Sequence, residues 1–310
     1  LFQQPSPLNI LLIKLRALGD VLLSTPVITT LKMSFPDSVI DFAVLRENKE
    51  IVEYNPMLRK VLVIDKAWDN LPLFKRLSMY REFIKSLKET RYDLVIDLQN
   101  SPRSIWVGFF SRGRYKIGYK KPQNFFYDLR LTQVKDVQHN VDDLLYLLSP
   151  VVPGRISRKL FLQFPSSVPE LLEKRYNLSD RKYVIIHPGA GRRRRFKMWG
   201  ISNFSKVADY ISGLGYEVFI IGGPGDSDLI EKFRSELGSH ADIFYFDNEF
   251  SVLSLAAVIS KARLFIGNDS GPLHIADAMG VPSIGIFGAS SPLRWGVITP
   301  PHLNIYKQIE

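Results

Sequence analysis

The sequence of 310 residues contains no cysteine and no long uninterrupted apolar run. Without cysteine the chain cannot form disulfides, thiolate metal sites or a cysteine nucleophile, which fits a reducing cytoplasm. The longest apolar segment, residues 281–289, is interrupted by Pro282, Gly285 and Gly288 and falls short of the roughly 20 residues of a membrane span. Residues 1–7 carry no basic segment, so no signal peptide is predicted and a cytoplasmic location is expected.

Two common nucleotide-binding motifs are also missing. The first strand is not followed by G-x-G-x-x-G, and the second ends in Val44-Leu45-Arg46 without an acidic residue, which argues against a dinucleotide site in the first half. The loop after His187 lacks the G-K-[ST] ending of a P-loop, which argues against a magnesium-dependent nucleoside triphosphatase. The D-x-D pattern at residues 226–228 is too short to indicate a metal ion. No metal site and no cofactor are predicted.

Basic residues exceed acidic ones, and the formal net charge is +10. This excess favours an anionic partner such as a nucleotide, a phosphorylated lipid, a membrane surface or a nucleic acid. The basic residues form three clusters: Lys75, Arg76, Arg81, Lys85 and Lys88; Lys116, Lys120 and Lys121; and Arg192, Arg193, Arg194, Arg195 and Lys197. A solvated helix face explains the first cluster equally well. Aromatic residues are not interleaved with the four arginines, so a nucleic-acid partner is not predicted.

Apolar strand-like runs alternate with helix-period segments along almost the whole chain, which is typical of β-α-β units on parallel sheets. In the first half we expect strands at 10–14, 39–44, 61–64 and 94–98, and helices at 21–33, 50–54, 73–90 and 141–148. After the linker-like segment 150–154, we expect strands at 160–164, 183–187, 217–221, 243–246, 264–266 and 283–287, and helices at 170–176, 204–214, 228–237, 252–260 and 273–279. The pattern predicts two facing Rossmann-like α/β domains, residues 1–152 and 153–310, with a cleft between them.

The most informative segment is the polar turn at residues 267–274, which lies between an apolar strand and a helix. Open parallel sheets bind ligands at such turns, because glycines permit close approach and the helix start offers unpaired N–H groups. Asp269, Ser270 and His274 add directional polar groups there. Asp269 or Ser270 could instead simply cap the helix. The crowding of several polar residue types favours a binding function.

Two further loops follow strand ends and therefore belong to the same kind of site. In residues 15–20, Gly19 allows a tight turn, and Asp20 at the helix start can act as an N-cap or as a general base. In the second loop, Gly189, Ala190 and Gly191 precede the arginine run and Lys197. Free backbone N–H groups beside fixed positive charge form an anion cradle suited to a diphosphate. The arginine run itself suits a diphosphate, the phosphates of an acceptor or a membrane.

A third loop, residues 222–228, follows the strand expected at 217–221. A carboxylate at this position could accept hydrogen bonds from ribose hydroxyls, and Asp226 is the candidate. Capping of the next helix by Asp226 or Asp228 is the simpler role for either residue.

Taken together, these segments resemble glycosyltransferase family 9, the bacterial ADP-heptose:lipopolysaccharide heptosyltransferases. The matching segments, in order, are I-L-L-I-K-L-R-A-L-G-D-V-L-L-S-T-P at 10–26, R-Y-D-L-V-I-D-L-Q at 91–99, H-P-G-A at 187–190, K-M-W at 197–199, I-G-G-P at 221–224, G-N-D-S-G-P-L-H at 267–274 and F-G-A-S-S-P-L-R-W at 287–295. The resemblance implies a GT-B fold, in which the first domain binds the acceptor sugar, the second binds the nucleotide-sugar donor, and the active site lies in the interdomain cleft. Family members usually continue further, with a C-terminal helix that returns to the first domain.

The resemblance also implies an activity: inverting, metal-independent transfer of heptose from ADP-heptose to the anionic inner core of lipopolysaccharide. By position, Asp20 is similar to the family's catalytic base and Lys197 to its diphosphate-binding lysine, while Arg16 and Gly19 fall on the acceptor side. The donor-binding residues that the resemblance implies are Gly189, Ala190, Gly191, Asp226, Asn268, Asp269, Ser270, Gly271 and His274. The basic clusters of the first half would suit a phosphorylated lipid acceptor at the inner face of the membrane.

Three other functions are compatible with the same loops. The chain could transfer the sugar of another nucleotide sugar, or it could be a nucleotide-sugar epimerase on the same fold. It could also be a non-catalytic module that binds anionic glycolipid or nucleic acid through its arginines.

Overall fold

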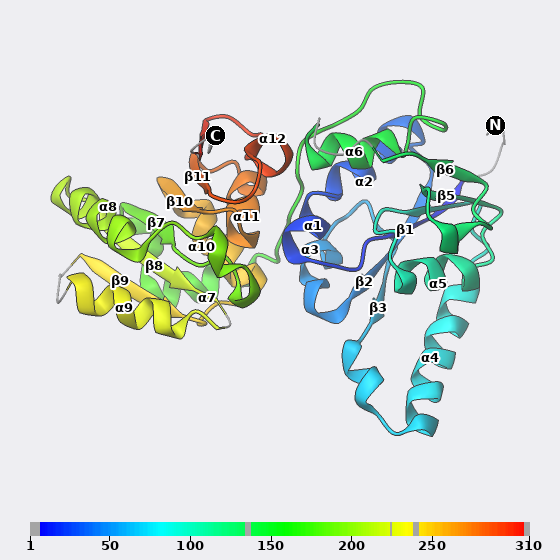
Figure 1. The fold of residues 1–310 in the computed structure, drawn as a ribbon, viewed down its shortest axis with the longest axis horizontal. Coiled ribbons are helices and arrows are strands. Elements are labelled where there is room, and N and C mark those ends of the chain that lie inside the picture. The colour runs from blue at the N-terminus through cyan, green and yellow to red at the C-terminus, as the bar shows by residue number, and fades with distance from the viewer. Residues whose placement is uncertain (1–6, 134–137, 224, 238–241, 307–310) are drawn as a thin grey trace. The chain divides into compact units, whose positions relative to one another are not determined.

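The computed structural model describes residues 7–133, 138–223, 225–237 and 242–306, and the chain divides into two compact units, Leu1–Phe161 and Leu162–Glu310. Each unit holds a six-stranded sheet in which all paired strands are parallel (Figure 1). The prediction of two Rossmann-like α/β domains is therefore confirmed. In the described part of the chain, no helix combines the length and the apolar character that crossing a membrane requires.

The first unit has the strand order β3-β2-β1-β4-β5-β6. Its strands are β1 (Asn9–Ile13), β2 (Val39–Leu45), β3 (Lys60–Ile64), β4 (Leu94–Asp97), β5 (Tyr115–Tyr119) and β6 (Leu129–Leu131). Its helices are α1 (Leu18–Leu22), α2 (Thr25–Ser34), α3 (Glu50–Glu53), α4 (Leu73–Lys88), α5 (Pro102–Phe110) and α6 (Asn140–Tyr146). On one face of the sheet, Leu11 and Ile13 share a buried cluster with Phe83 and Leu87 of α4 and Val107 of α5.

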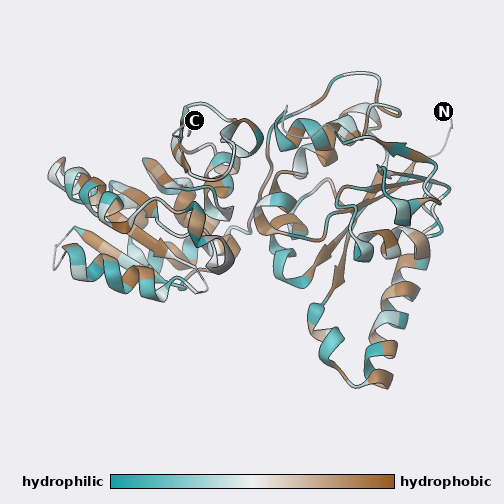
Figure 2. Cartoon of the chain, viewed as in Figure 1, coloured by the Kyte–Doolittle hydropathy of each residue, from teal (hydrophilic) through white to brown (hydrophobic). Residues whose placement is uncertain are grey.

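The second unit repeats this arrangement with the order β12-β11-β10-β7-β8-β9. Its strands are β7 (Tyr183–His187), β8 (Glu217–Gly222), β9 (Ile243–Asp247), β10 (Leu264–Asn268), β11 (Ser283–Phe287) and β12 (His302–Tyr306). Its helices are α7 (Ser167–Tyr176), α8 (Ile201–Gly213), α9 (Ser227–Leu237), α10 (Val252–Lys261), α11 (Gly271–Met279) and α12 (Pro292–Trp295). The buried strands are almost wholly apolar, as Figure 2 shows, because both faces of a parallel sheet are covered.

Two predicted elements are wrong. The single helix expected at 21–33 is two helices, α1 and α2, because the chain turns at residues 23–24 before α2 begins at Thr25. The strand expected at 160–164 does not form. In that segment the Phe161 N–H donates to Oγ1 of Thr25, at 2.9 Å, instead of joining a strand ladder.

The division between the units falls after Phe161, whereas the sequence suggested residue 152. The intervening residues belong to the first unit. There the N–H of Ser157 donates a hydrogen bond to Oγ1 of Thr30 at 3.0 Å. This bond, together with the one between Phe161 and Thr25, keeps the connecting segment on α2.

Candidate active site

The two central strands of the second sheet, β7 and β10, are where its strand order reverses. They pair in parallel with Gly267 opposite His187, so both strands end at the same edge of the sheet. The crevice at the carboxyl ends of two such strands is the usual ligand site of this fold. His187 ends β7 and Asn268 ends β10, and the loops that follow them carry most of the predicted donor-binding residues.

The predicted diphosphate-binding residue, Lys197, ends a short 3₁₀ turn at Arg192–Lys197. Its Nζ donates to Oδ2 of Asp269 at 2.7 Å, and the two side chains are only 14% and 9% exposed. His274 in α11 adds a third polar group, with Nε2 3.9 Å from Oδ1 of Asp269. The carboxylate of Asp269 is therefore engaged with Lys197, and the N-cap position of α11 is occupied by Ser270 rather than Asp269.

Asn268 braces the loop that contains Gly189, Ala190 and Gly191. Its Nδ2 donates to the carbonyl oxygen of Pro188 at 2.6 Å, and its Oδ1 accepts the N–H of Trp199 at 2.9 Å. Both ends of segment 188–199 are thus fixed to the end of β10. As a consequence, one short segment with both ends fixed carries the glycine loop and Lys197. Within it Gly191 has φ of +80°, and a Cβ built there would have no atom within 4 Å.

A buried histidine links three of the loops in this unit. Oγ of Ser270 lies 3.2 Å from Nδ1 of His187, and Oδ2 of Asp226 lies 3.8 Å from Nε2 of the same ring. Burial lowers the pKa of His187 to about 4, so the imidazole is neutral at physiological pH. The sequence motif contained His187, but its role as the centre of these contacts was not predicted. A polar residue ending the wholly apolar strand β7 is the signal that could have indicated it.

Ser270 is the N-cap residue of α11, but its side chain makes no capping hydrogen bond. Asp226 forms a tight turn, in which its Oδ2 accepts the N–H of Gly223 at 3.0 Å and its backbone oxygen accepts the N–H groups that begin α9. Burial raises the pKa of this carboxyl despite the hydrogen bond from Gly223. Gly189 packs against the Asp226 carboxylate so closely that a Cβ at residue 189 would lie 2.5 Å from Oδ2.

Arg195 forms a bidentate ion pair with Asp228, the second acidic residue of that loop. The guanidinium nitrogens lie 2.6 and 2.5 Å from the two carboxylate oxygens, and one also donates to the carbonyl oxygen of Gly225. The hydrogen bonds from Arg195 lower the pKa of Asp228. Arg195 therefore clamps the arginine turn to the start of α9. The side chains of residues 192–194 lie outside the described part of the structure.

In the first unit, Asp20 occupies the first turn of α1. Its Oδ2 accepts the N–H of Ala17 at 3.2 Å, which is the carboxylate half of a capping interaction, and its Oδ1 lies 3.9 Å from Nζ of Lys14. The side chain remains 26% exposed. Asp20 is thus not the N-cap, a position that Ala17 occupies, but the third residue of the helix, from which it also presents a carboxylate to solvent. Gly19 lies in the same turn, and the Arg16 side chain is exposed.

The sequence did not predict the polar network beneath this loop. Asp97, fully buried at the end of β4, accepts hydrogen bonds from the backbone of Gln99 and Asn100 and from the hydroxyls of Ser104 and Tyr127, at 2.8–3.0 Å. Burial raises the pKa of Asp97.

This network shapes the turn that follows β4 and so places Gln99. Oε1 of Gln99 accepts the N–H of Arg16 at 3.1 Å. The turn that carries Arg16, Gly19 and Asp20 is therefore braced by β4, the strand beside β1. A buried Asp at the end of an apolar strand was the available signal for this network.

Two Rossmann-like units, with a lysine and a glycine-rich loop at the strand-order reversal of the second, have the architecture of the GT-B class. The sequence model of glycosyltransferase family 9 (heptosyltransferase) matches residues 80–310. The chain belongs to this family, and the resemblance found in the sequence is confirmed.

Comparisons with individual proteins agree with this assignment. The chain is 30% identical, over 89% of its length and 81% of the relative's, to lipopolysaccharide heptosyltransferase 3 of Escherichia coli K12. Its fold is similar to the family 9 glycosyltransferase of Veillonella parvula, with a TM-score of 0.86 and 23% identity over 96% of this chain and 86% of that one. It is also similar to Escherichia coli ADP-heptose lipopolysaccharide heptosyltransferase II, with a TM-score of 0.82 and 20% identity over 96% and 90%.

Proposed function

We propose that the chain transfers heptose from ADP-heptose to the inner core of lipopolysaccharide, with inversion at the anomeric carbon and without a metal ion. Two of the relatives named above have heptosyltransferase and lipopolysaccharide in their names, and one of these names also contains ADP-heptose. The observation that carries the proposal is the largely buried pair of Lys197 and Asp269 at the carboxyl ends of β7 and β10, beside Gly189 and its neighbours. Within the described residues, no group of three or more histidine, aspartate or glutamate side chains is arranged to hold a metal.

The donor half of the proposal rests on the chemistry of the leaving group. When the glycosidic bond breaks, negative charge develops on the diphosphate of ADP. The Lys197 ammonium has three N–H donors, of which one goes to Asp269 and the others can reach phosphate oxygens. The backbone N–H groups of Gly189, Ala190 and Gly191 supply further donors on the segment that Asn268 fixes. One such contact typically contributes about 10²–10³ in rate.

The nucleoside half of the donor is assigned to the neighbouring polar groups. Among the described residues, none donates a hydrogen bond to the buried Oδ1 of Asp226. A buried acceptor without a donor is rare, and a movement of this loop that exposed the oxygen to a ribose hydroxyl would satisfy it. We assign Asp226 to the ribose, and Ser270, Gly271 and His274 to the wall of the donor site on α11.

The acceptor half of the proposal assigns Asp20 as the general base. A sugar hydroxyl is too weak an acid to ionise at neutral pH, so its proton must pass to a base as the oxygen attacks the anomeric carbon. The capping contact with Ala17 and the nearby Lys14 hold the Asp20 carboxylate in one orientation. Arg16 and Gly19, in the same braced turn, would contact the acceptor.

The test is release of ADP from ADP-heptose, measured with and without a lipopolysaccharide-core acceptor and in the presence of EDTA. The proposal predicts ADP release that requires the acceptor, a heptosylated product, and no loss of rate with EDTA. Conversion of the sugar without acceptor would instead identify an epimerase. Steeply salt-dependent binding of glycolipid without ADP release would identify a non-catalytic module.

A further inference from the structure

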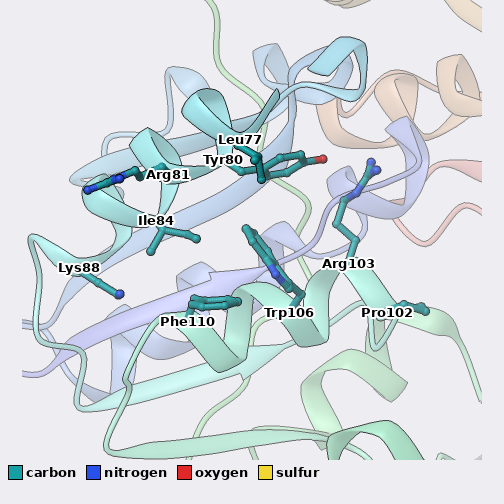
Figure 3. A pocket seen from close by; sticks show the side chains of 9 residues that line it. All are labelled: Leu77, Tyr80, Arg81, Ile84, Lys88, Pro102, Arg103, Trp106 and Phe110. Carbon is teal, nitrogen blue, oxygen red and sulfur yellow. The ribbon is translucent and has the colours of Figure 1, made fainter. Parts of the chain in front are cut away.

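A groove of about 840 Å³ lies between α4 and α5 in the first unit (Figure 3). Its apolar walls come from both helices: Leu77, Tyr80 and Ile84 from α4, and Trp106 and Phe110 from α5. The aromatic rings pack edge to face or tilted, with the Trp106 centroid 5.5 Å from Tyr80 and 4.9 Å from Phe110. The volume is within the range of about 300–1,000 Å³ that small-ligand sites have.

Cationic side chains border this apolar surface. Figure 3 shows Arg81 and Lys88 along one side of the groove and Arg103 at the other end. Arg103 is paired with Asp69. No carboxylate among the described residues forms an ion pair with Arg81 or Lys88, and Nζ of Lys88 lies 5.9 Å from the centre of the Phe110 ring. An apolar groove edged by unpaired cations is complementary to an anionic amphiphile.

Hydrophilic and hydrophobic residues are mixed along α4, as Figure 2 shows. The helix carries five basic residues and one acidic residue, Glu82, and only Phe83 and Leu87 are buried. At its N-terminal end, Leu73 and Leu77 are each 56% exposed and Phe74 is 88% exposed. Basic residues beside exposed apolar ones are the composition of helices that lie in a membrane interface.

We propose that α4 and α5 form a docking site for a bilayer that contains anionic phospholipid. An acyl chain would enter the groove against Trp106 and Phe110, and the lipid phosphate would bind Arg81 and Lys88. The exposed Phe74 would insert among the neighbouring chains. The biological reason for such docking rests on the proposed function, because an enzyme that acts on a lipid-linked acceptor must work at a membrane surface.

The first experiment is co-sedimentation of the full chain with vesicles of phosphatidylcholine, alone or mixed with phosphatidylglycerol. We expect binding to the anionic vesicles that is at least tenfold tighter than to the neutral ones. The double variant Leu77→Asp with Arg81→Glu should bind the anionic vesicles at least tenfold more weakly than the wild type, since each cation near an anionic surface contributes about fivefold to the affinity. The matched control, Leu171→Asp with Arg263→Glu at exposed positions of the second unit, should stay within twofold of wild type.

The second experiment asks whether an acyl chain reaches the groove. Phosphatidylglycerol brominated on its acyl chains should quench tryptophan fluorescence in the wild type, and Trp106→Phe should remove most of that quenching while vesicle binding persists. Equal binding of the groove variant and the wild type, or binding without any quenching that depends on Trp106, would overturn the proposal.

A transfer assay separates this proposal from the proposed function. With a water-soluble acceptor that lacks acyl chains, the groove variant should work as fast as the wild type. With a lipid-linked acceptor in anionic vesicles, the transfer rate of the groove variant should be at least tenfold lower than that of the wild type. Equal rates with this acceptor would contradict a docking role. If the wild type transfers heptose to neither acceptor, the proposed function fails, and vesicle binding still decides the docking site.

Discussion

The ammonium of Lys197 and the carboxylate of Asp269 lie 2.7 Å apart although the two residues are 72 positions apart in the chain. Both side chains are largely withdrawn from water, and the desolvation of each charge is offset by the charge of its partner. This pair joins the segment after β7 to the loop after β10. It orients the lysine towards the place where the fold binds ligands.

Replacement of Lys197 by alanine should reduce kcat for heptosyl transfer by about 10²–10³, because the charge that stabilises the leaving diphosphate is lost. Asp269→Asn should have a smaller effect, since the ammonium remains but loses its ionic partner. Steady-state kinetics with ADP-heptose measures both variants. Lys206→Ala, at an exposed position of α8, is the control. A Lys197→Ala enzyme within threefold of wild type would exclude the assigned role.

Replacement of Gly189 by alanine should weaken ADP binding and lower the melting temperature. The added Cβ would lie 2.5 Å from Oδ2 of Asp226, which forces one of the two loops to move. Such overpacking typically costs about 1–3 kcal/mol. Calorimetry of ADP binding and thermal unfolding measure the two effects.

The matched control for this prediction is Gly213→Ala. Gly213 ends α8, and a Cβ built there has no atom within 4 Å. This variant should bind ADP normally and unfold at an equal or slightly higher temperature. Equal behaviour of the two alanine variants would contradict the close contact at Gly189.

Tyr127→Phe should destabilise the first unit by about 1–3 kcal/mol, because it removes a hydroxyl that donates to the buried Asp97 at 2.9 Å. Thermal unfolding measures the loss. Tyr146→Phe is the control, since that side chain is 39% exposed. The same shift in both variants would show that the bond to Asp97 does not stabilise the fold.

The stability of the second unit should fall as the pH is lowered from about 6.5 to 4. The pKa of His187 is about 4 in the folded chain, because of burial, and about 6.5 when unfolded, so the unfolded state binds more protons between these values. The contribution of the neutral His187 ring to the free energy of unfolding is of the order of 3 kcal/mol. It is fully present above pH 6.5 and is lost as the pH falls towards 4. Melting temperatures of wild type and His187→Gln should therefore converge as the pH falls.

Side-chain NMR of the histidine nitrogens checks the same assignment directly. His187 should remain neutral at pH 5.5, whereas the exposed His302 serves as the reference for an accessible ring. Protonation of His187 with a midpoint near pH 6.5 would contradict the buried, neutral ring.

The alternation of strands and helices was readable from the sequence because buried parallel strands are continuous apolar runs, and both β7 and β11 have the predicted bounds. The strands β5, β6 and β12 were not predicted. They are short or partly exposed, and β5 contains Lys116 and Gly118, so none forms a clear apolar run. Leu160 and Leu162 led to the wrong prediction of a strand at 160–164, since both are buried without belonging to a strand.

The site was predictable as a set of loops but not as a set of contacts. Residues that follow parallel strands must share one edge of the sheet, which is why Lys197 and Asp269 could be expected near each other. Their direct pairing, the bracing by Asn268 and the central place of His187 depend on strand register and loop path. These features come from contacts between residues far apart in the chain, which local patterns do not encode.

The rate of heptosyl transfer by Asp20→Asn, measured together with its affinity for ADP, tests the central claim most directly. Asparagine keeps the size of the side chain but cannot accept the acceptor's proton, so transfer should fall by at least 10² while ADP binds as in the wild type. Asp37→Asn, at an exposed position of the same unit, should leave both quantities unchanged. Transfer by Asp20→Asn at the wild-type rate would contradict the account.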